Sequence, residues 1–153
     1  VDGCAAPNFA LSVRAMAKGF LKLVFPPEDF DDNLREACRR IVTAMMNYPE
    51  LVGGTERLDT LLMNAARGRI ISKIGAEGVW LCGVLPSPEY KKGLGIAMKI
   101  EDGDDKRARA VISVEVLRQL GIFEAETLQN ISPLPIKNRR GEAVGKVEAS
   151  FTL

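Results

Sequence analysis

Hydrophobic positions along the chain follow a helical spacing in the first 66 residues and a strand-like pattern after them. In the first part, apolar residues recur every three or four positions, as in helices that bury one face. The spacing predicts a helix from Phe9 to Val24, capped by Asn8 and ended by Pro26 and Pro27. A second helix after "DFDD" carries an apolar stripe made of Leu34, Ala37, Cys38, Ile41, Val42, Met45 and Met46.

A loop, "LVGGT", separates the second helix from a third. Thr55 is expected to cap this short helix, which runs from about Glu56 to Ala66 and is closed by Gly68. Backbone amides at such a helix start, together with Thr55, also suit an anionic group of a substrate. Helix capping alone explains the segment equally well.

The second part of the chain predicts three neighbouring strands, over Arg69 to Lys73, Gly78 to Leu85 and Leu94 to Glu101. Their short connections favour antiparallel pairing. "GLGIAMKI" resembles a phosphate-binding loop, but its glycines lead into a strand rather than a helix, so we interpret it as a turn and a strand.

The remaining segments predict a helix from Arg107 to Leu120, stopped by Gly121, and a last strand from about Val144 to Leu153. No internal repeat or long linker interrupts the chain. We therefore expect a single domain over residues 1 to 153, of the α+β class, with an antiparallel sheet flanked by helices.

Charge and cysteine content narrow the functional classes. With 21 Lys and Arg against 20 Asp and Glu, the net charge is +1, so neither nucleic acid nor an anionic membrane is an expected partner. No apolar run approaches membrane-spanning length. Three cysteines without a Cys-x-x-Cys spacing argue against a disulfide framework and for a reducing, cytoplasmic location.

The chain contains no histidine, which excludes Ser-His-Asp and Cys-His mechanisms. A general base must then be a lysine, a carboxylate or a tyrosine. Lys73 stands inside a predicted strand, two residues before Gly75. It is either an exposed lysine whose stem covers apolar neighbours, or a cleft lysine that meets an anion or a nucleophile while Gly75 lets a ligand approach the backbone.

The opening "DGC" leaves two interpretations. Asp2, Gly3 and Cys4 form either a turn with a small buried thiol, or a turn that presents one metal ligand and one substrate acceptor. One thiolate does not make a zinc site, because zinc requires three or four ligands.

Four segments follow one another along the chain: "VDGCAAPNFAL", "RIVTAMMNYPELVGGTERLDTLLM", "GRIISKIGAEGVWLCGV" and "GLGIAMKIEDGDDKRARAV". In this order they resemble the C-terminal half of the L-asparaginase II family, the serine/lysine type. The resemblance implies a fold similar to serine β-lactamases and glutaminases. It also implies hydrolysis of asparagine to aspartate and ammonia by a serine of a Ser-x-x-Lys motif.

The family pattern assigns roles to several positions. Lys73, in its Lys-x-Gly setting with Gly75, matches the family's strand lysine, which is catalytic. Asp2 matches an aspartate beside the substrate, and Cys4 matches a ligand of a zinc ion shared with a cysteine and a lysine from earlier in the family's sequence.

The chain departs from the family in one respect, because it contains no Ser-x-x-Lys and no Cys-x-x-Lys motif. We therefore expect an incomplete fragment, inactive and weakly zinc-binding by itself, whose partner is a missing N-terminal half or a second copy in a homo-oligomer. The alternative is a non-catalytic domain of the same fold that binds a small molecule or a protein.

Overall fold

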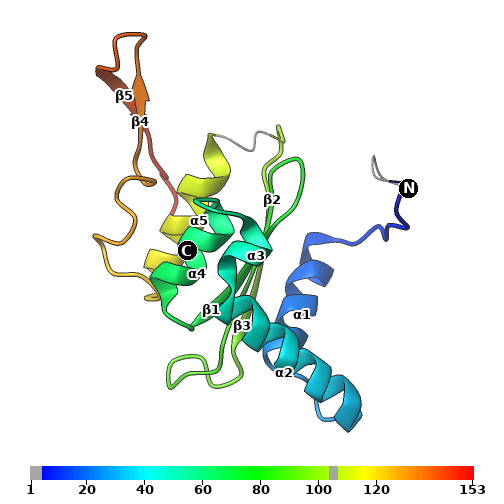
Figure 1. Cartoon of the computed structure of the whole chain (residues 1–153). Coiled ribbons are helices and arrows are strands. Elements are labelled where there is room, and N and C mark those ends of the chain that lie inside the picture. The colour runs from blue at the N-terminus through cyan, green and yellow to red at the C-terminus, as the bar shows by residue number, and fades with distance from the viewer. Residues whose placement is uncertain (1–4, 104–106) are drawn as a thin grey trace.

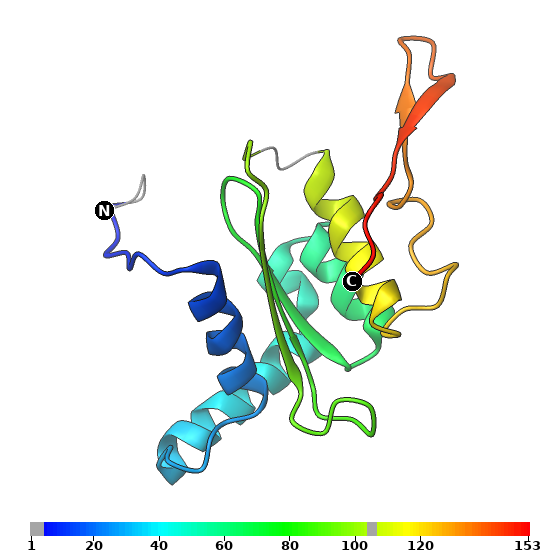
Figure 2. The ribbon, with the colours of Figure 1, turned by 180° about the vertical axis from the view of Figure 1, so that it is seen from behind.

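A three-stranded antiparallel sheet forms the centre of the protein, with helices on both faces (Figures 1 and 2). The computed structural model describes residues 5–103 and 107–153. Strands β1 (Ile70–Ile74), β2 (Val79–Val84) and β3 (Leu94–Lys99) lie in that order across the sheet. The three predicted strands, their antiparallel pairing and the α+β class are thus confirmed.

The helices form the outer layers. Helices α1 (Val13–Val24) and α2 (Asp32–Asn47) lie on one face of the sheet, and α4 (Leu58–Ala66) and α5 (Ala108–Gln119) lie on the other (Figure 2). The short helix α3 (Pro49–Gly53) connects the two layers. Predicted helices α2 and α5 are confirmed to within one or two residues.

Strand alternation gives each face of the sheet its own core. Trp80, Cys82 and Val84 pack against α4 and the segment that follows α5. Ile71 packs on the opposite face against Val24 of α1 and Val42 of α2. Because side chains alternate along a strand, these two sets of residues cannot exchange faces without a shift of register.

The start of the first helix was predicted wrongly. Helix α1 begins at Val13 rather than Phe9, and its cap is Ser12, whose hydroxyl accepts a hydrogen bond from the Ala15 amide at 3.1 Å. Asn8 lies in the irregular segment before it, where Phe9 is exposed. Apolar residues continue upstream of the helix, so their spacing alone did not mark its start.

The "LVGGT" segment was predicted to be a loop, but most of it belongs to helix α3. Pro49 begins this helix, where proline needs no amide hydrogen. Helix α4 begins at Leu58 with Arg57 as its cap, so Thr55 caps no helix and lies exposed in the preceding turn.

The tail was predicted to hold one strand from Val144 to Leu153. The first part of that strand is confirmed as β5 (Ala143–Val147), which pairs with a strand that was not predicted, β4 (Leu134–Lys137), in a hairpin that projects from the body of the protein (Figure 1). Its turn is closed by Asn138, whose side-chain oxygen accepts from the amides of Arg140 and Glu142. Residues 148–153 are not a strand but return to α5, where Gln119 bonds their backbone.

None of the helices in the described part of the chain is long and apolar enough to cross a membrane.

Candidate functional site

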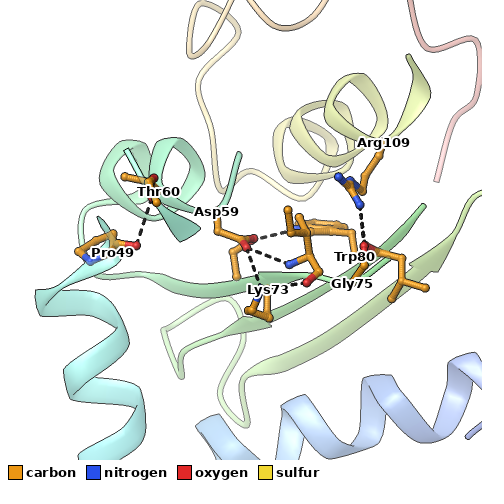
Figure 3. A network of polar contacts seen from close by, with 11 residues as sticks. Pro49, Asp59, Thr60, Lys73, Gly75, Trp80 and Arg109 are labelled. Atoms are coloured by element: carbon orange, nitrogen blue, oxygen red, sulfur yellow. Dashed lines mark hydrogen bonds and ion pairs between the residues drawn. The ribbon is translucent and has the colours of Figure 1, made fainter. Parts of the chain in front are cut away.

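Lys73 lies on β1, an edge strand of the sheet, and its side chain is 47% exposed. Its ammonium group donates a hydrogen bond to the Ile74 carbonyl at 3.0 Å and lies 3.8 Å from a carboxylate oxygen of Asp59 (Figure 3). The side chain therefore does not extend freely into solvent. It is held along the edge of the strand, with its charged end between backbone and carboxylate.

Asp59 lies in the first turn of α4 and is completely buried. One carboxylate oxygen accepts from the Ser72 hydroxyl at 2.6 Å, and the other accepts from the Ile74 amide at 2.9 Å. Trp80, also buried, donates its indole N–H to the Ser72 oxygen at 3.0 Å. These bonds connect α4, β1 and β2 behind the Lys73 ammonium.

Sequence reasoning did not identify Asp59, although a signal was present. Residues three, four and seven positions further on, Leu62, Met63 and Ala66, are all buried on the same helix face. A carboxylate on the apolar face of a helix must find buried partners. An acidic residue in a first helical turn is, however, also explained by the helix dipole, so its place in the sequence does not by itself indicate burial.

Thr60 fixes the position of α4 next to α3. Its hydroxyl lies within hydrogen-bond distance of the carbonyl oxygens of Pro49, at 3.1 Å, and Gly54, at 2.7 Å. A Cβ atom at Gly53 would approach the Thr60 hydroxyl to 2.8 Å, so this glycine permits the close approach of the two helices. Gly53 and Gly54 thus lie directly against the first turn of α4, which carries Asp59.

The hairpin that follows Lys73 is held by two cationic side chains from other elements. Arg109 of α5 donates to the Gly75 carbonyl at 2.8 Å, and Lys99 of β3 donates to the Glu77 carbonyl at 2.5 Å. The Gly75 amide donates to the Val79 carbonyl at 2.9 Å, so both backbone groups of Gly75 have partners within the protein. A Cβ atom at Gly75 would lie 3.1 Å from the Val79 Cβ.

The predicted site residues are brought together only in part. Lys73 and Gly75 lie together on β1 and its hairpin, whereas no polar contact among the described residues joins Thr55 to Lys73. Asp2, Gly3 and Cys4 lie outside the described residues.

Ser72, next to Lys73 in sequence, is not a candidate nucleophile. Its side chain is completely buried. Because the indole of Trp80 can only donate, the Ser72 oxygen accepts that bond and its own hydrogen is directed to Asp59.

Cys82 is also unsuited to nucleophilic chemistry. It lies opposite Ser72 in the β1–β2 ladder and is completely buried. Burial raises the pKa of the Cys82 thiol far above its ordinary value of 9.0, and the nearby charge of Asp59 raises it further. The thiol therefore stays protonated in the folded protein.

This raised pKa predicts a loss of stability in alkali. Above pH 9 the unfolded chain loses the Cys82 proton while the folded protein retains it, so the free energy of unfolding should fall by up to about 1.4 kcal/mol per pH unit. Urea denaturation at pH 8.5 to 10.5 measures the slope. Cys82→Ala, although less stable overall, should show a flatter slope over this range, and an equally steep slope would contradict the assignment.

An apolar groove of about 650 Å³ lies on the opposite face of the sheet, between α1, α2 and the segment before α1. Leu81, which pairs directly with Lys73 in the β1–β2 ladder, contributes to its wall, as do Phe20 and Cys38. The groove therefore borders the strand pair that carries Lys73.

The zinc prediction is not tested by the described residues. Within residues 5–103 and 107–153, no group of three or more Cys, Asp or Glu side chains could hold a metal ion. Cys38 and Cys82 are both free and buried. The zinc prediction thus rests on Cys4 and on ligands that these segments do not supply.

The family model described as L-asparaginase II matches residues 1–149. No curated protein sequence matches the chain closely enough to count as a relative.

Proposed function

The chain belongs to the L-asparaginase II family, and from this membership we propose that it supplies part of the active site of an amidohydrolase that converts L-asparagine to aspartate and ammonia. The family match extends over nearly the whole chain and agrees with the four motif segments that surround Lys73.

The observation that carries the proposal is the position of the Lys73 ammonium. It is half exposed at a sheet edge, yet it is held by the Ile74 carbonyl and faces a buried carboxylate. A charged group that is accessible and also fixed in place suits the stabilisation of charge that develops in a reaction. A lysine that only solubilises a strand needs no such partners.

In the proposed reaction, the hydroxyl of a serine outside these 153 residues attacks the side-chain amide carbon of asparagine. The carbon–nitrogen bond breaks, ammonia leaves, and an aspartyl ester with the serine remains until water hydrolyses it. Lys73 would stabilise the negative oxygen of the tetrahedral intermediate and help to move protons to the leaving nitrogen.

A substrate contact of Asp2 is proposed from the family pattern, and contacts of Gly75 and Thr55 are proposed from their places in the local sequence. Asp2 would lie beside the substrate, and Gly75 and Thr55 would border it. The exposed position of Thr55, in the turn before α4, leaves its hydroxyl available to a ligand. Cys4 would contribute one ligand to a zinc ion, and no step of the reaction above depends on that ion.

Three broader features also remain proposals. An antiparallel sheet with helices on both faces is compatible with a β-lactamase-like fold. The free thiols of Cys38 and Cys82 are compatible with a reducing, cytoplasmic location. The nucleophile would come from another part of the polypeptide or from a partner chain, since the printed sequence has no Ser-x-x-Lys motif.

That missing motif also favours a second candidate, a non-catalytic domain that binds a small amide or a protein. The two functions differ in one assay, ammonia release from L-asparagine by the product of the complete reading frame. We expect sustained release. Binding of asparagine without ammonia release would support the binding domain and overturn the enzyme.

A further inference from the structure

We propose that Asp59 is the positioning residue of Lys73, a role that rests on the proposed function of this lysine. Asp59 would not touch the substrate. Its carboxylate would instead hold the Lys73 ammonium at the place where the reaction needs a positive charge (Figure 3).

The Asp59 carboxylate is fixed without help from the lysine. One of its oxygens accepts from Ser72 and the other from the Ile74 amide. Burial of an ionised carboxylate is costly unless such partners are present. Asp59 therefore offers a negative charge of set position and orientation to any cation that reaches it.

The hydrogen bonds from Trp80 to Ser72 and from Ser72 to Asp59 can run in this direction only. The Trp80 indole can only donate, which makes Ser72 accept from it and donate to Asp59. Trp80 and Ser72 are both completely buried. Asp59 thus receives its hydrogen bond from Ser72 in a part of the core that solvent does not reach.

Two partners hold the ammonium group of Lys73. A half-exposed lysine has many side-chain rotamers, and ordering it costs conformational entropy. The same oxygen that accepts from the Ile74 amide lies 3.8 Å from the ammonium group, whose second partner is the Ile74 carbonyl. The lysine is therefore held at the Ile74 carbonyl directly and at the Ile74 amide through Asp59. Such ordering matters because catalytic groups must be placed to within about 1 Å.

Two variants separate positioning from mere stability. Asp59→Asn removes the charge next to Lys73, whereas Ser113→Ala removes an equally buried hydroxyl that bonds the Arg109 carbonyl within α5 and leaves Asp59 and its partners in place. In the product of the complete reading frame, Asp59→Asn should lower kcat for asparagine on the order of 100-fold with a smaller change in KM. Ser113→Ala should retain activity to within about threefold, because the Ser113 hydroxyl bonds neither Lys73 nor Asp59. Equal losses in kcat for the two variants would overturn the proposal.

A second measurement needs no enzyme activity and so distinguishes this inference from the proposed function. Acylation of Lys73 by an N-hydroxysuccinimide ester, followed by peptide mass spectrometry, reports how firmly the amine is held. Relative to the exposed Lys91, Lys73 should react about fivefold faster in Asp59→Asn and at the wild-type rate in Ser113→Ala. Unchanged rates in Asp59→Asn would overturn the positioning role even if asparagine is hydrolysed.

Asp59 is buried, and a variant that does not fold would leave both measurements without a result. The wild-type chain therefore provides a further test. Side-chain NMR relaxation of its lysines should give a clearly higher order parameter for Lys73 than for Lys91 and Lys92, which lie exposed in the β2–β3 connection. A Lys73 as mobile as these two would contradict the proposal. Order at Lys73 without asparagine hydrolysis would support the inference while the proposed function failed.

Discussion

Replacing Lys73 by methionine in the product of the complete reading frame is expected to reduce asparagine hydrolysis by about 10² to 10⁴-fold. Methionine keeps much of the apolar stem and removes the ammonium group that faces Asp59 and bonds the Ile74 carbonyl. Because the chain has no histidine, an imidazole of these residues cannot take over its proton transfers. The measurement is kcat from the initial rate of ammonia release at saturating asparagine.

Lys91→Met is the matched control for this change. Lys91 is an exposed lysine in the connection between β2 and β3, whereas Lys73 lies near the other connection, at the opposite end of the β1–β2 pair. Replacing Lys91 should leave the rate of ammonia release within about twofold, since surface changes away from a site are close to neutral. Comparable rates for the Lys73 and Lys91 variants would remove Lys73 from the mechanism.

Replacing Gly95 by alanine is expected to destabilise the protein by about 3 kcal/mol or more, because helix α1 lies directly against β3 there. A Cβ atom at Gly95 would lie 2.0 Å from the Ala17 carbonyl oxygen and 2.8 Å from the Leu21 amide nitrogen. Both are backbone atoms in α1, so the helix as a whole would have to move. Urea denaturation monitored by circular dichroism measures the loss.

Gly19→Ala tests the same substitution on the same helix without the clash. Gly19 lies within α1, and a Cβ atom there would have no heavy atom of the described residues within 4 Å. Alanine is the better helix former, so this variant should be more stable by about 0.5 to 1 kcal/mol. If the two variants were equally stable, α1 would not pack on β3 as described.

The elements with strong local patterns could be predicted from the sequence. The stripe of α2 and the three strands around Lys73 were expected at nearly their observed positions, and "GLGIAMKI" is the predicted turn and strand. The start of α1 was misplaced because exposed Phe9 and Leu11 continue its apolar spacing. Strand β4 was missed and β5 was predicted too long, because most residues of this hairpin are exposed and no buried alternation marks the strands.

The candidate site was predicted only where its chemistry is local. Lys73 and Gly75 stand close together in sequence, so their shared hairpin followed from the strand pattern. Asp59 reaches Lys73 only because α4 packs on β1, and Arg109 reaches Gly75 from α5 across 34 residues. Such contacts depend on how helices and strands pack together, which the periodicity of one segment does not contain.

The central claim is that these residues carry the lysine part of an asparagine-hydrolysing site whose serine nucleophile lies elsewhere. The most direct test is ammonia release from L-asparagine by the purified 153-residue chain, alone and after addition of a separately produced L-asparaginase II segment that carries the Ser-x-x-Lys motif. We predict no release from the chain alone and release after addition that is lost with Lys73→Met. Robust release by the 153 residues alone would contradict the claim.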